Sequence, residues 1–419
     1  MTAVDGGRAG MAYDIIVVGG GIGGSALATV MARAGRSVLL LEKSLVYEDK
    51  VRGEWIAPWG VTETKRLALY DTLLSAGGHH LSSHVTYDET RDPAEAEARA
   101  LPLGMFAPDV PGPLCIRHPV HCQALFDAAS AAGATALRGV DVKQVELGDT
   151  SSVTYVHDGQ QHTEHAPLVV GAEGRQSVVR RAAGLTLHQD KPHHWFAGLL
   201  VDGVQAWDDT RQAIGTEEDF AFLAFPQGNG RMRVYGGWDL AAKTRFAGQE
   251  GPRRFLDAFR MKSAPHNEAI AQGTPASPLL AYYNNCSAAE RPFAPGAVLV
   301  GDAAGWNDPI LGLGLSITYR DVRLVSDILK ETPHGREPDF RPYAEERKER
   351  MRRLRIASEL QAKLDMEFGE EARARRRRYH EASAVDPMLG MHGVATLAGP
   401  EAVPAEVFDA AHVARVVGV

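Results

Sequence analysis

The stretch of sequence that decides the fold is Tyr13-Asp-Ile-Ile-Val-Val-Gly-Gly-Gly-Ile-Gly-Gly24. Its first half is apolar and β-branched, which predicts a buried strand, and the run of glycines predicts a tight turn. Apolar residues then recur at helical spacing from Ala26 to Ala34, and Gly35 ends the predicted helix. A second apolar strand is expected over residues 37–41. Strand, helix and strand in this order predict a parallel βαβ unit.

The glycine-rich turn fits the pattern G-x-G-x-x-G and lies where its mechanism requires, between a strand and a helix. Such glycines allow the tight turn, the approach of a pyrophosphate to the backbone and the packing of the helix on the strand. The helix N-terminus then faces the phosphates, and Glu42, at the end of the second strand, can accept hydrogen bonds from a ribose. We therefore expect a bound dinucleotide. Its predicted contacts are Gly19, Gly21, Gly23, Gly24, Glu42 and Lys43.

The composition argues against several classes of protein. The 419 residues are 44% hydrophobic and 23% charged, which is ordinary for a globular protein large enough for two lobes. The net charge of −8 argues against nucleic acid or an anionic membrane as the partner. No apolar run approaches the roughly 20 residues that a membrane span needs, and residues 1–11 lack the apolar core of a secretory signal. We expect a cytoplasmic protein.

Neither the cysteines nor the histidine pairs indicate a metal site. Cys115, Cys122 and Cys286 are too few and too scattered for a disulfide framework or a zinc site. The pairs His79-His80 and His193-His194 have no carboxylate at metal-ligand spacing, and we interpret them as surface histidines. We expect no bound metal ion.

Two later segments resemble those of a known family. Val169-Val-Gly-Ala-Glu-Gly-Arg-Gln-Ser-Val-Val-Arg180 resembles the G-A-D-G-x-x-S-x-x-R segment of the flavoprotein aromatic hydroxylases, the superfamily of p-hydroxybenzoate hydroxylase, with Glu173 in place of aspartate. Val298-Leu-Val-Gly-Asp-Ala-Ala-Gly-Trp-Asn-Asp-Pro-Ile-Leu-Gly-Leu-Gly314 resembles their G-D-A-A-x-x-x-x-P-x-x-G-x-G segment. The resemblance covers roughly residues 13–330.

This resemblance implies FAD as the cofactor. In that superfamily an aspartate hydrogen-bonds the ribityl chain of the flavin, a role that the match implies for Asp302. Gly312 and Gly314 let the backbone come close to a flat ring, and a helix starting there would aim its positive end at the flavin N1 and C2 carbonyl. Further contacts to FAD are expected at Val142, Glu173, Gly174, Gly301 and Leu313.

A fourth segment, Asp49-Lys-Val-Arg-Gly-Glu-Trp-Ile-Ala-Pro-Trp-Gly60, resembles the D-R-x-x-G-E-x-x-Q-P-G-G stretch of squalene epoxidases. Lys50 stands where that family has arginine, and Arg52 is offset by two positions. Either Arg52 or Arg117 could contact the FAD pyrophosphate, and the alternative for each is an ordinary surface salt bridge. The candidate catalytic residues beside the flavin are Glu54, Trp55 and Pro309.

The family's organisation implies an α/β fold. A Rossmann-like FAD-binding domain would carry an inserted β-sheet substrate domain, followed by a C-terminal helical region. The expected discontinuous FAD-binding domain comprises residues 12–85, 115–185 and 290–335, the substrate domain residues 86–114 and 186–289, and the helical region residues 336–419.

The function that the resemblance implies is that of an FAD-dependent monooxygenase. It would insert one oxygen atom from dioxygen, through a flavin C4a-hydroperoxide, into an apolar aromatic or olefinic small molecule, as enzymes of secondary metabolism do. No second G-x-G-x-x-G is present, so NADH or NADPH would bind transiently, or a separate flavin reductase would supply the electrons.

Three alternatives stay open. Flavin-dependent halogenases share a similar G-D-A-A-G-x-x-D-P segment, but they also carry a W-x-W-x-I-P motif that this chain lacks. A geranylgeranyl-reductase-like double-bond reductase has an F-P motif that Phe222-Leu-Ala-Phe-Pro226 faintly echoes. A non-enzymatic flavoprotein would bind FAD without consuming a nicotinamide.

Overall fold

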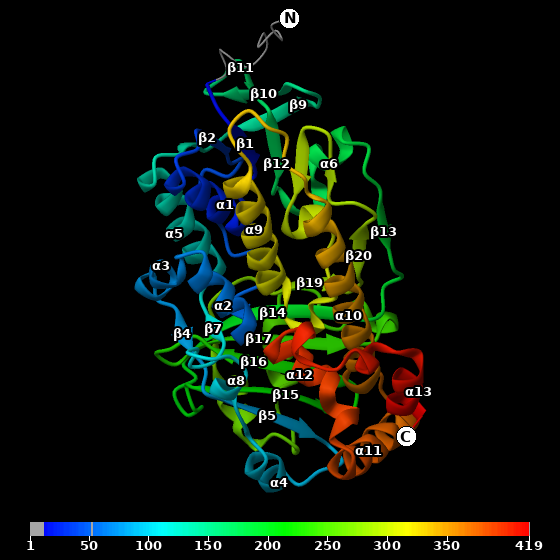
Figure 1. The fold of residues 1–419 in the computed structure, drawn as a ribbon. Helices are drawn as coiled ribbons and strands as arrows, with labels where there is room; N and C mark the ends of the chain where they lie inside the picture. The colour runs from blue at the N-terminus through cyan, green and yellow to red at the C-terminus, as the bar shows by residue number, and fades with distance from the viewer. Residues whose placement is uncertain (1–11, 52, 419) are drawn as a thin grey trace, which may run out of the picture.

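Two stacked sheets form the framework of the protein in the computed structural model, which describes residues 12–51 and 53–418. Figure 1 places one sheet above the other along the long axis of the molecule. The upper sheet has the order β21-β22-β12-β1-β2-β8, and its strands are parallel except for β21. Its strands are β1 (Ile15–Val18), β2 (Val38–Leu41), β8 (Thr135–Leu137), β12 (Leu168–Gly171), β21 (Phe293–Ala294) and β22 (Ala297–Leu299).

The predicted strand–helix–strand unit is confirmed by β1, α1 (Ile22–Arg33) and β2. Successive residues of β1 point to opposite faces of the sheet. Ile15 and Val17 pack on the side of α1, α5 (His118–Ala131) and α9 (Gly314–Glu331), which lie side by side in Figure 1. Ile16 and Val18 pack on the opposite side, against a small antiparallel sheet. That sheet consists of β9 (Asp141–Glu146), β10 (Ser151–His157) and β11 (Gln160–Ala166).

The lower sheet has the order β18-β14-β17-β16-β15-β5-β6, with β19 alongside β14. Its segment β5 joins β15 in parallel, and Val85 and Tyr87 of β5 are buried. Because β5 is continuous, it runs through the domain boundary that we placed between residues 85 and 86. The strands are β5 (Ser83–Asp88), β6 (Leu101–Pro102), β14 (Trp195–Asp202), β15 (Arg211–Glu217), β16 (Phe220–Pro226), β17 (Arg231–Trp238), β18 (Thr274–Pro275) and β19 (Leu280–Tyr283).

The lower sheet buries both of its faces. Phe220 and Phe222 of β16 pack against α7 (Gly251–Asp257) through an aromatic cluster with Phe255 and Phe259. Leu223 and Phe225 point the other way, toward the upper part of the molecule and the C-terminal helices. One face therefore builds the core of the lower lobe, and the other is available to line a site between the two sheets.

Short elements connect the two sheets. One small sheet consists of β3 (Trp55–Ile56), β7 (Leu114–Cys115) and β4 (His79–His80). A second consists of β13 (Leu187–Gln189) paired with β20 (Ser287–Ala289). The short helices are α2 (Pro58–Arg66), α3 (Tyr70–Ser75), α4 (Pro93–Ala98), α6 (Val178–Ala182) and α8 (Glu268–Gln272).

The expected C-terminal helical region is confirmed. Its long helix α10 (Arg341–Asp365) buries Leu354, Ala357 and Leu360, the apolar stripe visible in the sequence. It is followed by α11 (Glu370–Val385), α12 (Met391–Ala398) and α13 (Ala410–Gly418). These helices cover the lower sheet in Figure 1.

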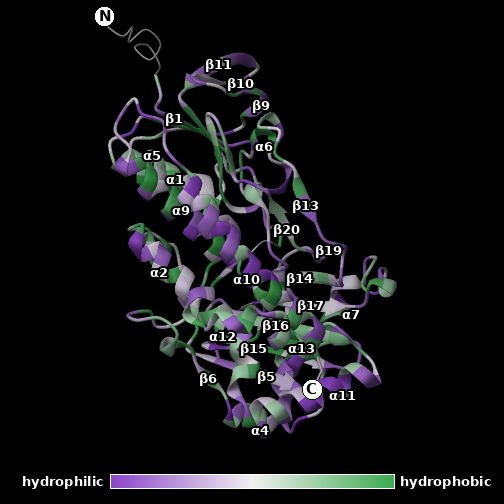
Figure 2. Ribbon diagram, turned by 45° about the vertical axis from the view of Figure 1, so that its right-hand side comes forward, coloured by the Kyte–Doolittle hydropathy of each residue, from purple (hydrophilic) through white to green (hydrophobic). Residues whose placement is uncertain are grey.

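The distribution of hydropathy follows the layers. In Figure 2 many strands of the two sheets carry hydrophobic residues, whereas hydrophilic residues prevail in α11. In the part of the chain that the structure describes, no helix is both long and apolar enough to cross a membrane.

A buried carboxylate joins the upper sheet to α9 and α10. Asp321 accepts hydrogen bonds from Gly301 N at 2.9 Å, from Arg347 Nε at 3.0 Å and from Arg350 Nη2 at 2.7 Å, and its side chain is fully buried. Burial alone would raise the pKa of Asp321, but the two guanidinium groups hold it below the ordinary value. Asp321 is therefore ionised and paired within the core.

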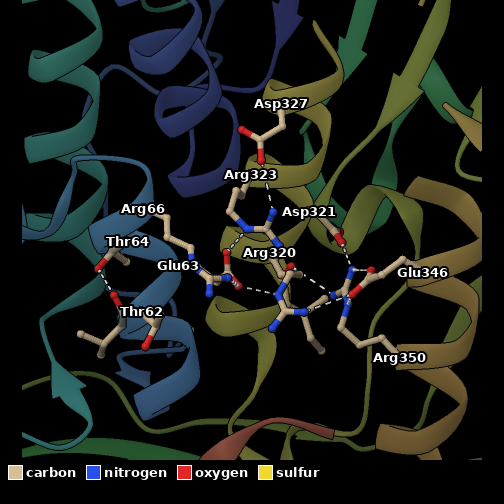
Figure 3. A network of polar contacts seen from close by, with 12 residues as sticks. Thr62, Glu63, Thr64, Arg66, Arg320, Asp321, Arg323, Asp327, Glu346 and Arg350 are labelled. Carbon is tan, nitrogen blue, oxygen red and sulfur yellow. Dashed lines mark hydrogen bonds and ion pairs between the residues drawn. The ribbon is translucent and has the colours of Figure 1, made fainter. Parts of the chain in front are cut away.

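The pairing extends across the surface of α9. Figure 3 shows Arg350 and Arg320 both reaching Glu346, and Arg320 and Arg323 both reaching Glu63 of α2. The distance from Arg320 Nε to Glu63 Oε1 is 2.6 Å, and Glu63 is buried. Helices α2, α9 and α10 are thus held in one arrangement by charges that have little access to water.

We predict that Asp321→Ala lowers the free energy of unfolding by about 3–5 kcal/mol, because it leaves two buried guanidinium groups without their counter-charge. Chemical denaturation measures this loss. Asp327→Ala on the same helix is the control, since Asp327 is 45% exposed and should cost only about 0–1 kcal/mol. Equal losses in the two variants would contradict this account of the core.

Candidate active site

The four sequence motifs meet in space around the N-terminal ends of α1 and α9. We number them as follows: the first is residues 19–24, the second 169–180, the third 298–314 and the fourth 49–60. A methyl group placed on Gly19 would lie 2.7 Å from the backbone of Ala172, so the first and second motifs touch. Placed on Gly23, it would lie 2.9 Å from Thr318 Cγ2, and Thr318 also lies beside Gly301 of the third motif. Segments separated by hundreds of residues therefore form one continuous surface.

The nucleotide end of this surface is formed by the glycine-rich turn and the end of β2. A Cβ atom on Gly21 would meet nothing within 4 Å, so the turn is open on that side, whereas one on Gly24 would lie 1.8 Å from Gly19 O. Glu42 Oε2 accepts from Gly20 N and Oε1 accepts from Ser44 N, both at 2.7 Å. A carboxylate oxygen has two lone pairs, so Glu42 can still accept from a ribose.

The second motif fastens onto the third. Glu173 Oε1 accepts from Val179 N at 2.9 Å, which fixes the turn that begins at Gly174, and burial raises the pKa of Glu173. The other oxygen, Oε2, is buried without a partner among the described residues. Arg180 donates to Ala303 O at 3.0 Å. The substitution of glutamate for the family's aspartate is therefore accommodated inside this turn.

Asp302 lies at the open edge of the same junction. Its Oδ2 atom is 3.3 Å from Arg175 Nε, and both side chains are about one-third exposed. The Arg175 guanidinium lies 4.6 Å from the centre of the Trp306 ring. Asp302 is thus accessible to a ligand that runs along the strand ends, as the resemblance requires.

The N-terminus of α9 is preorganised for an electron-rich ring. Gly312 has a φ of 68°, in the left-handed region, and a Cβ atom there would approach the Trp55 ring to 3.2 Å. Leu313 precedes the helix without a side-chain cap, and the helix begins at Gly314. The first amides of α9 are therefore not capped by a side chain of the helix terminus and can face a bound group.

The two predicted basic contacts that the structure describes, Lys43 and Arg117, fall in different places. Lys43 is largely exposed and lies 3.9 Å from Asp141, beside Val142 of β9. Arg117 stands directly before α5, and its Nε atom is buried without a partner among the residues described. Arg52 lies outside the described residues, so its role stays a prediction.

Glu54 is surrounded by hydrogen-bond donors. Its Oε1 atom accepts from His118 N at 2.9 Å, and its Oε2 atom accepts from Arg233 Nε at 2.9 Å and from Gln227. Arg233 is fully buried and also pairs with Asp49. This geometry favours a positioning role for Glu54, joining β3, α5 and the lower sheet, over direct proton transfer.

A cavity of about 320 Å³ lies between the lower sheet, the third motif and the C-terminal helices. Its wall toward the third motif is apolar and includes Trp55, Ile310 and Leu311. Ile310 and Leu311 belong to the short helical turn that begins at Pro309. Phe222, Leu223 and Phe225 line it from β16, and further residues come from α10, α11 and α12. The cavity adjoins the surface on which the four motifs meet.

Trp55 is held in the cavity wall by a polar contact that the sequence did not indicate. Its Nε1 atom donates to Gln212 Oε1 at 2.7 Å, and Gln212 Nε2 lies 3.1 Å from His84 Nδ1. Burial lowers the pKa of His84 to about 4, so this histidine is neutral at pH 7. The Trp55 ring is consequently fixed between Gly312 and Phe225.

A second polar cluster lies beneath the third motif. Asp308 is buried, and its Oδ1 atom accepts from Ile310 N at 2.9 Å and from Asn284 Nδ2 at 3.1 Å. Asn284 also lies 2.9 Å from His194 Nε2. The interpretation of His194 as a surface residue was wrong: it lies directly before β14 and is fully buried.

The contacts of the C-terminal region with the third motif were not predicted from the sequence. Arg347 donates to Ala304 O at 3.0 Å and to Gly305 O at 2.9 Å, so it holds the loop of the third motif. A signal was available: Arg347 and Arg350 continue the buried stripe of Leu354 and Ala357 at helical spacing, where a charge requires a buried partner.

The environment of Asp308 generates a pH prediction. Burial raises its pKa from 3.8 to about 6, so the folded state loses stability as pH rises through this range. Asp308→Asn keeps the shape without the charge. We expect the apoprotein variant to gain about 2 kcal/mol relative to the unmodified chain between pH 4.5 and pH 7.5. Urea denaturation at the two pH values measures it, and a difference that does not change with pH would contradict the assignment.

Known proteins resemble this chain along most of its length. The squalene monooxygenase of Rattus norvegicus is 25% identical over 334 residues, which are 76% of this chain and 55% of that enzyme. The digeranylgeranylglycerophospholipid reductase 1 of Methanococcoides burtonii (strain DSM 6242 / NBRC 107633 / OCM 468 / ACE-M) is 28% identical over 320 residues, 73% of this chain and 71% of that protein. The chain thus spans little more than half the length of the squalene monooxygenase.

Solved structures share the fold at low sequence identity. The p-nitrophenol 4-monooxygenase PnpA of Pseudomonas putida DLL-E4 superposes with a TM-score of 0.76 at 18% identity, covering 93% of this chain and 99% of that one. The flavin-dependent brominase Bmp2 superposes with a TM-score of 0.74 at 14% identity, covering 96% and 97%.

One family model spans both lobes and the first part of the C-terminal region. It is described as an FAD binding domain, and it matches residues 12–358, most of the chain. The predicted superfamily is therefore confirmed, and the protein belongs to this family of FAD-binding proteins.

Proposed function

We propose that this protein is an FAD-dependent monooxygenase that oxidises an apolar aromatic or olefinic small molecule with dioxygen. The observation that carries the proposal is the largely apolar cavity of about 320 Å³. Its wall is shared with the third motif, where the N-terminus of α9 begins. A substrate in this cavity would meet the redox cofactor through the side formed by Trp55, Ile310 and Leu311.

The residues on the surface where the four motifs meet suit the successive parts of FAD. Gly19, Gly21, Gly23 and Gly24 with the N-terminus of α1 would hold the pyrophosphate, and Glu42 would accept from the ribose. Asp302 would receive the ribityl hydroxyls at its exposed carboxylate. The basic contact to the pyrophosphate is proposed to be Arg52 or Arg117, and Arg117 stands directly before α5.

Bound FAD would supply the reducing equivalents and the place at which dioxygen is activated. The chain's own groups prepare that place. The uncapped amides of α9 direct partial positive charge at Gly314, which stabilises negative charge on a ring lying there. Trp55, Phe225 and Leu311 keep water out of the adjoining cavity, which protects a reactive oxygen species from solvent.

The electron donor is proposed to be NADH or NADPH, with a separate flavin reductase as the alternative. Within residues 12–51 and 53–418 the parallel upper sheet already carries the G-x-G-x-x-G turn, so we assign no separate nicotinamide-binding domain there. A nicotinamide would then act transiently at the flavin edge.

A double-bond reductase is the second candidate. The similarity to the Methanococcoides burtonii reductase favours it, because that match covers 71% of the relative. Such an enzyme would use the same reduced cofactor but would add hydrogen to an olefin and leave dioxygen out of the product.

The decisive assay follows NADH and NADPH oxidation by the purified holoprotein under labelled dioxygen, with peroxide detection and a panel of aromatic and olefinic compounds. A monooxygenase would oxidise the nicotinamide faster with a suitable compound and place one labelled oxygen atom in the product. A saturated product without label would favour the reductase. A halogenated product formed only when chloride or bromide is added would favour a halogenase.

The glycine-rich turn provides a variant test of cofactor binding. Gly21→Ala adds a methyl group on the open side of the turn, so we expect an apoprotein of unchanged stability that binds FAD at least about tenfold more weakly. Titration followed by the quenching of flavin fluorescence measures the affinity. Gly148→Ala is the control, because a Cβ atom there also meets nothing within 4 Å but lies in the turn between β9 and β10. Equal FAD affinities would place the cofactor elsewhere.

A further inference from the structure

The cavity is polar at the end formed by the C-terminal helices. Toward the third motif its lining is apolar, but α10, α11 and α12 contribute polar side chains. These are Gln361, Asp365, Arg376, Tyr379, His380, Ser383, His392 and Thr396. Such an arrangement suits a molecule with an apolar body and one polar group.

Asp365 is the residue at this end whose surroundings are least favourable to it. It is the last residue of α10, where the carbonyl groups of the final turn concentrate partial negative charge. Its Oδ2 atom accepts from Gln361 Nε2 at 2.6 Å, and no other hydrogen bond to its carboxylate is found among the described residues. Burial raises the pKa of Asp365 to about 6.

The nearest cation does not neutralise Asp365. Arg376 comes from α11, but its Nε atom lies 2.7 Å from Asp88 Oδ2 and its Nη2 atom lies 2.7 Å from Glu89 Oε1. Its Nη1 atom donates to Glu367 O at 3.0 Å. The guanidinium therefore serves to fasten α11 to β5, and Asp365 remains a carboxylate that a ligand could satisfy.

The histidines of the same wall do not carry a compensating charge at neutral pH. Burial lowers the pKa values of His380 and His392 to about 4. Arg91 also lines the cavity; burial and repulsion from Arg99 lower its pKa, but its guanidinium stays charged at neutral pH. Tyr379 lines the same part of the cavity.

The two ends of the cavity are separated along β15. Trp55 is anchored to Gln212, and the backbone carbonyl of Asp365 accepts from Thr216 Oγ1 at 3.1 Å. Gln212 and Thr216 are four residues apart on the strand, a distance of about 13 Å. A ligand that spans the cavity would thus have its polar group roughly this far from the cofactor side.

We propose that Asp365 selects a substrate that carries an amine or a hydroxyl group at the end remote from the site of oxidation. The proposal rests on the function proposed above, because it assigns the cavity to the substrate. The carboxylate would accept hydrogen bonds from this donor group, and Gln361 and Tyr379 would surround it. The apolar body of the substrate would lie along Leu223 and Phe225.

The test compares four probes of one shape: 6-phenylhexylamine, 6-phenylhexan-1-ol, hexylbenzene and 6-phenylhexanoic acid. Their binding to the FAD-loaded protein is followed without turnover, through the change in the flavin absorption spectrum. We expect the amine and the alcohol to bind at least about tenfold more tightly than hexylbenzene and the acid. Preference for the amine over the alcohol would identify the donor as a cation.

Two variants locate the preference. Asp365→Asn should weaken binding of the amine about tenfold or more and leave hexylbenzene unchanged, with unaltered FAD content as the measure of folding. Glu345→Gln, an exposed carboxylate on the same helix, should change nothing. Equal binding of all four probes, tightest binding of the acid through Arg91, or a preference retained in Asp365→Asn would each overturn the proposal.

The outcome is separable from that of the function itself. The ranking of the probes is a binding measurement, so it stands or falls without any transfer of oxygen. If labelled dioxygen never enters a product but the ranking holds, the monooxygenase proposal fails and the role of Asp365 remains. If oxygen is transferred but the ranking is flat, only the assignment of Asp365 fails.

Discussion

The side chain of Asp321 is buried in the upper lobe and accepts hydrogen bonds from three donors on two separate segments. It fixes Gly301 at the end of the upper sheet, and it pairs with Arg347 and Arg350 from α10. Arg347 in turn holds the carbonyl groups of Ala304 and Gly305. Since removing one member of such a group leaves unpaired charge in the core, the loop of the third motif and the start of α9 have little freedom to move.

The ion pairs of Asp321 also position the cavity, through α10. Helix α10 leaves the Asp321 cluster at its N-terminal half and reaches the lower sheet at Asp365, where it meets Thr216. Helix α10 therefore holds the loop of the third motif through Arg347 near one end, and it contributes Asp365 to the polar wall of the cavity at the other. Arg376 completes the enclosure by fastening α11 to Asp88 of β5. A displacement of α10 would consequently also displace the loop of the third motif.

Local patterns were sufficient for the strand–helix–strand unit of the upper lobe and insufficient for contacts between distant segments. The strand, turn and helix over residues 15–33 follow from hydrophobic periodicity and glycine placement, which act between near neighbours. The parallel pairing of β5 with β15 and the burial of His194 depend on contacts between distant segments. No single-sequence pattern encodes those contacts, because a buried polar residue and a surface one have the same local spacing.

If the convergent motifs form one complete FAD site, the visible spectrum of the purified protein will show it. We expect a yellow protein, or a colourless one that takes up added FAD, with one flavin per chain and quenched flavin fluorescence. A protein that stays colourless and binds no added FAD would contradict it.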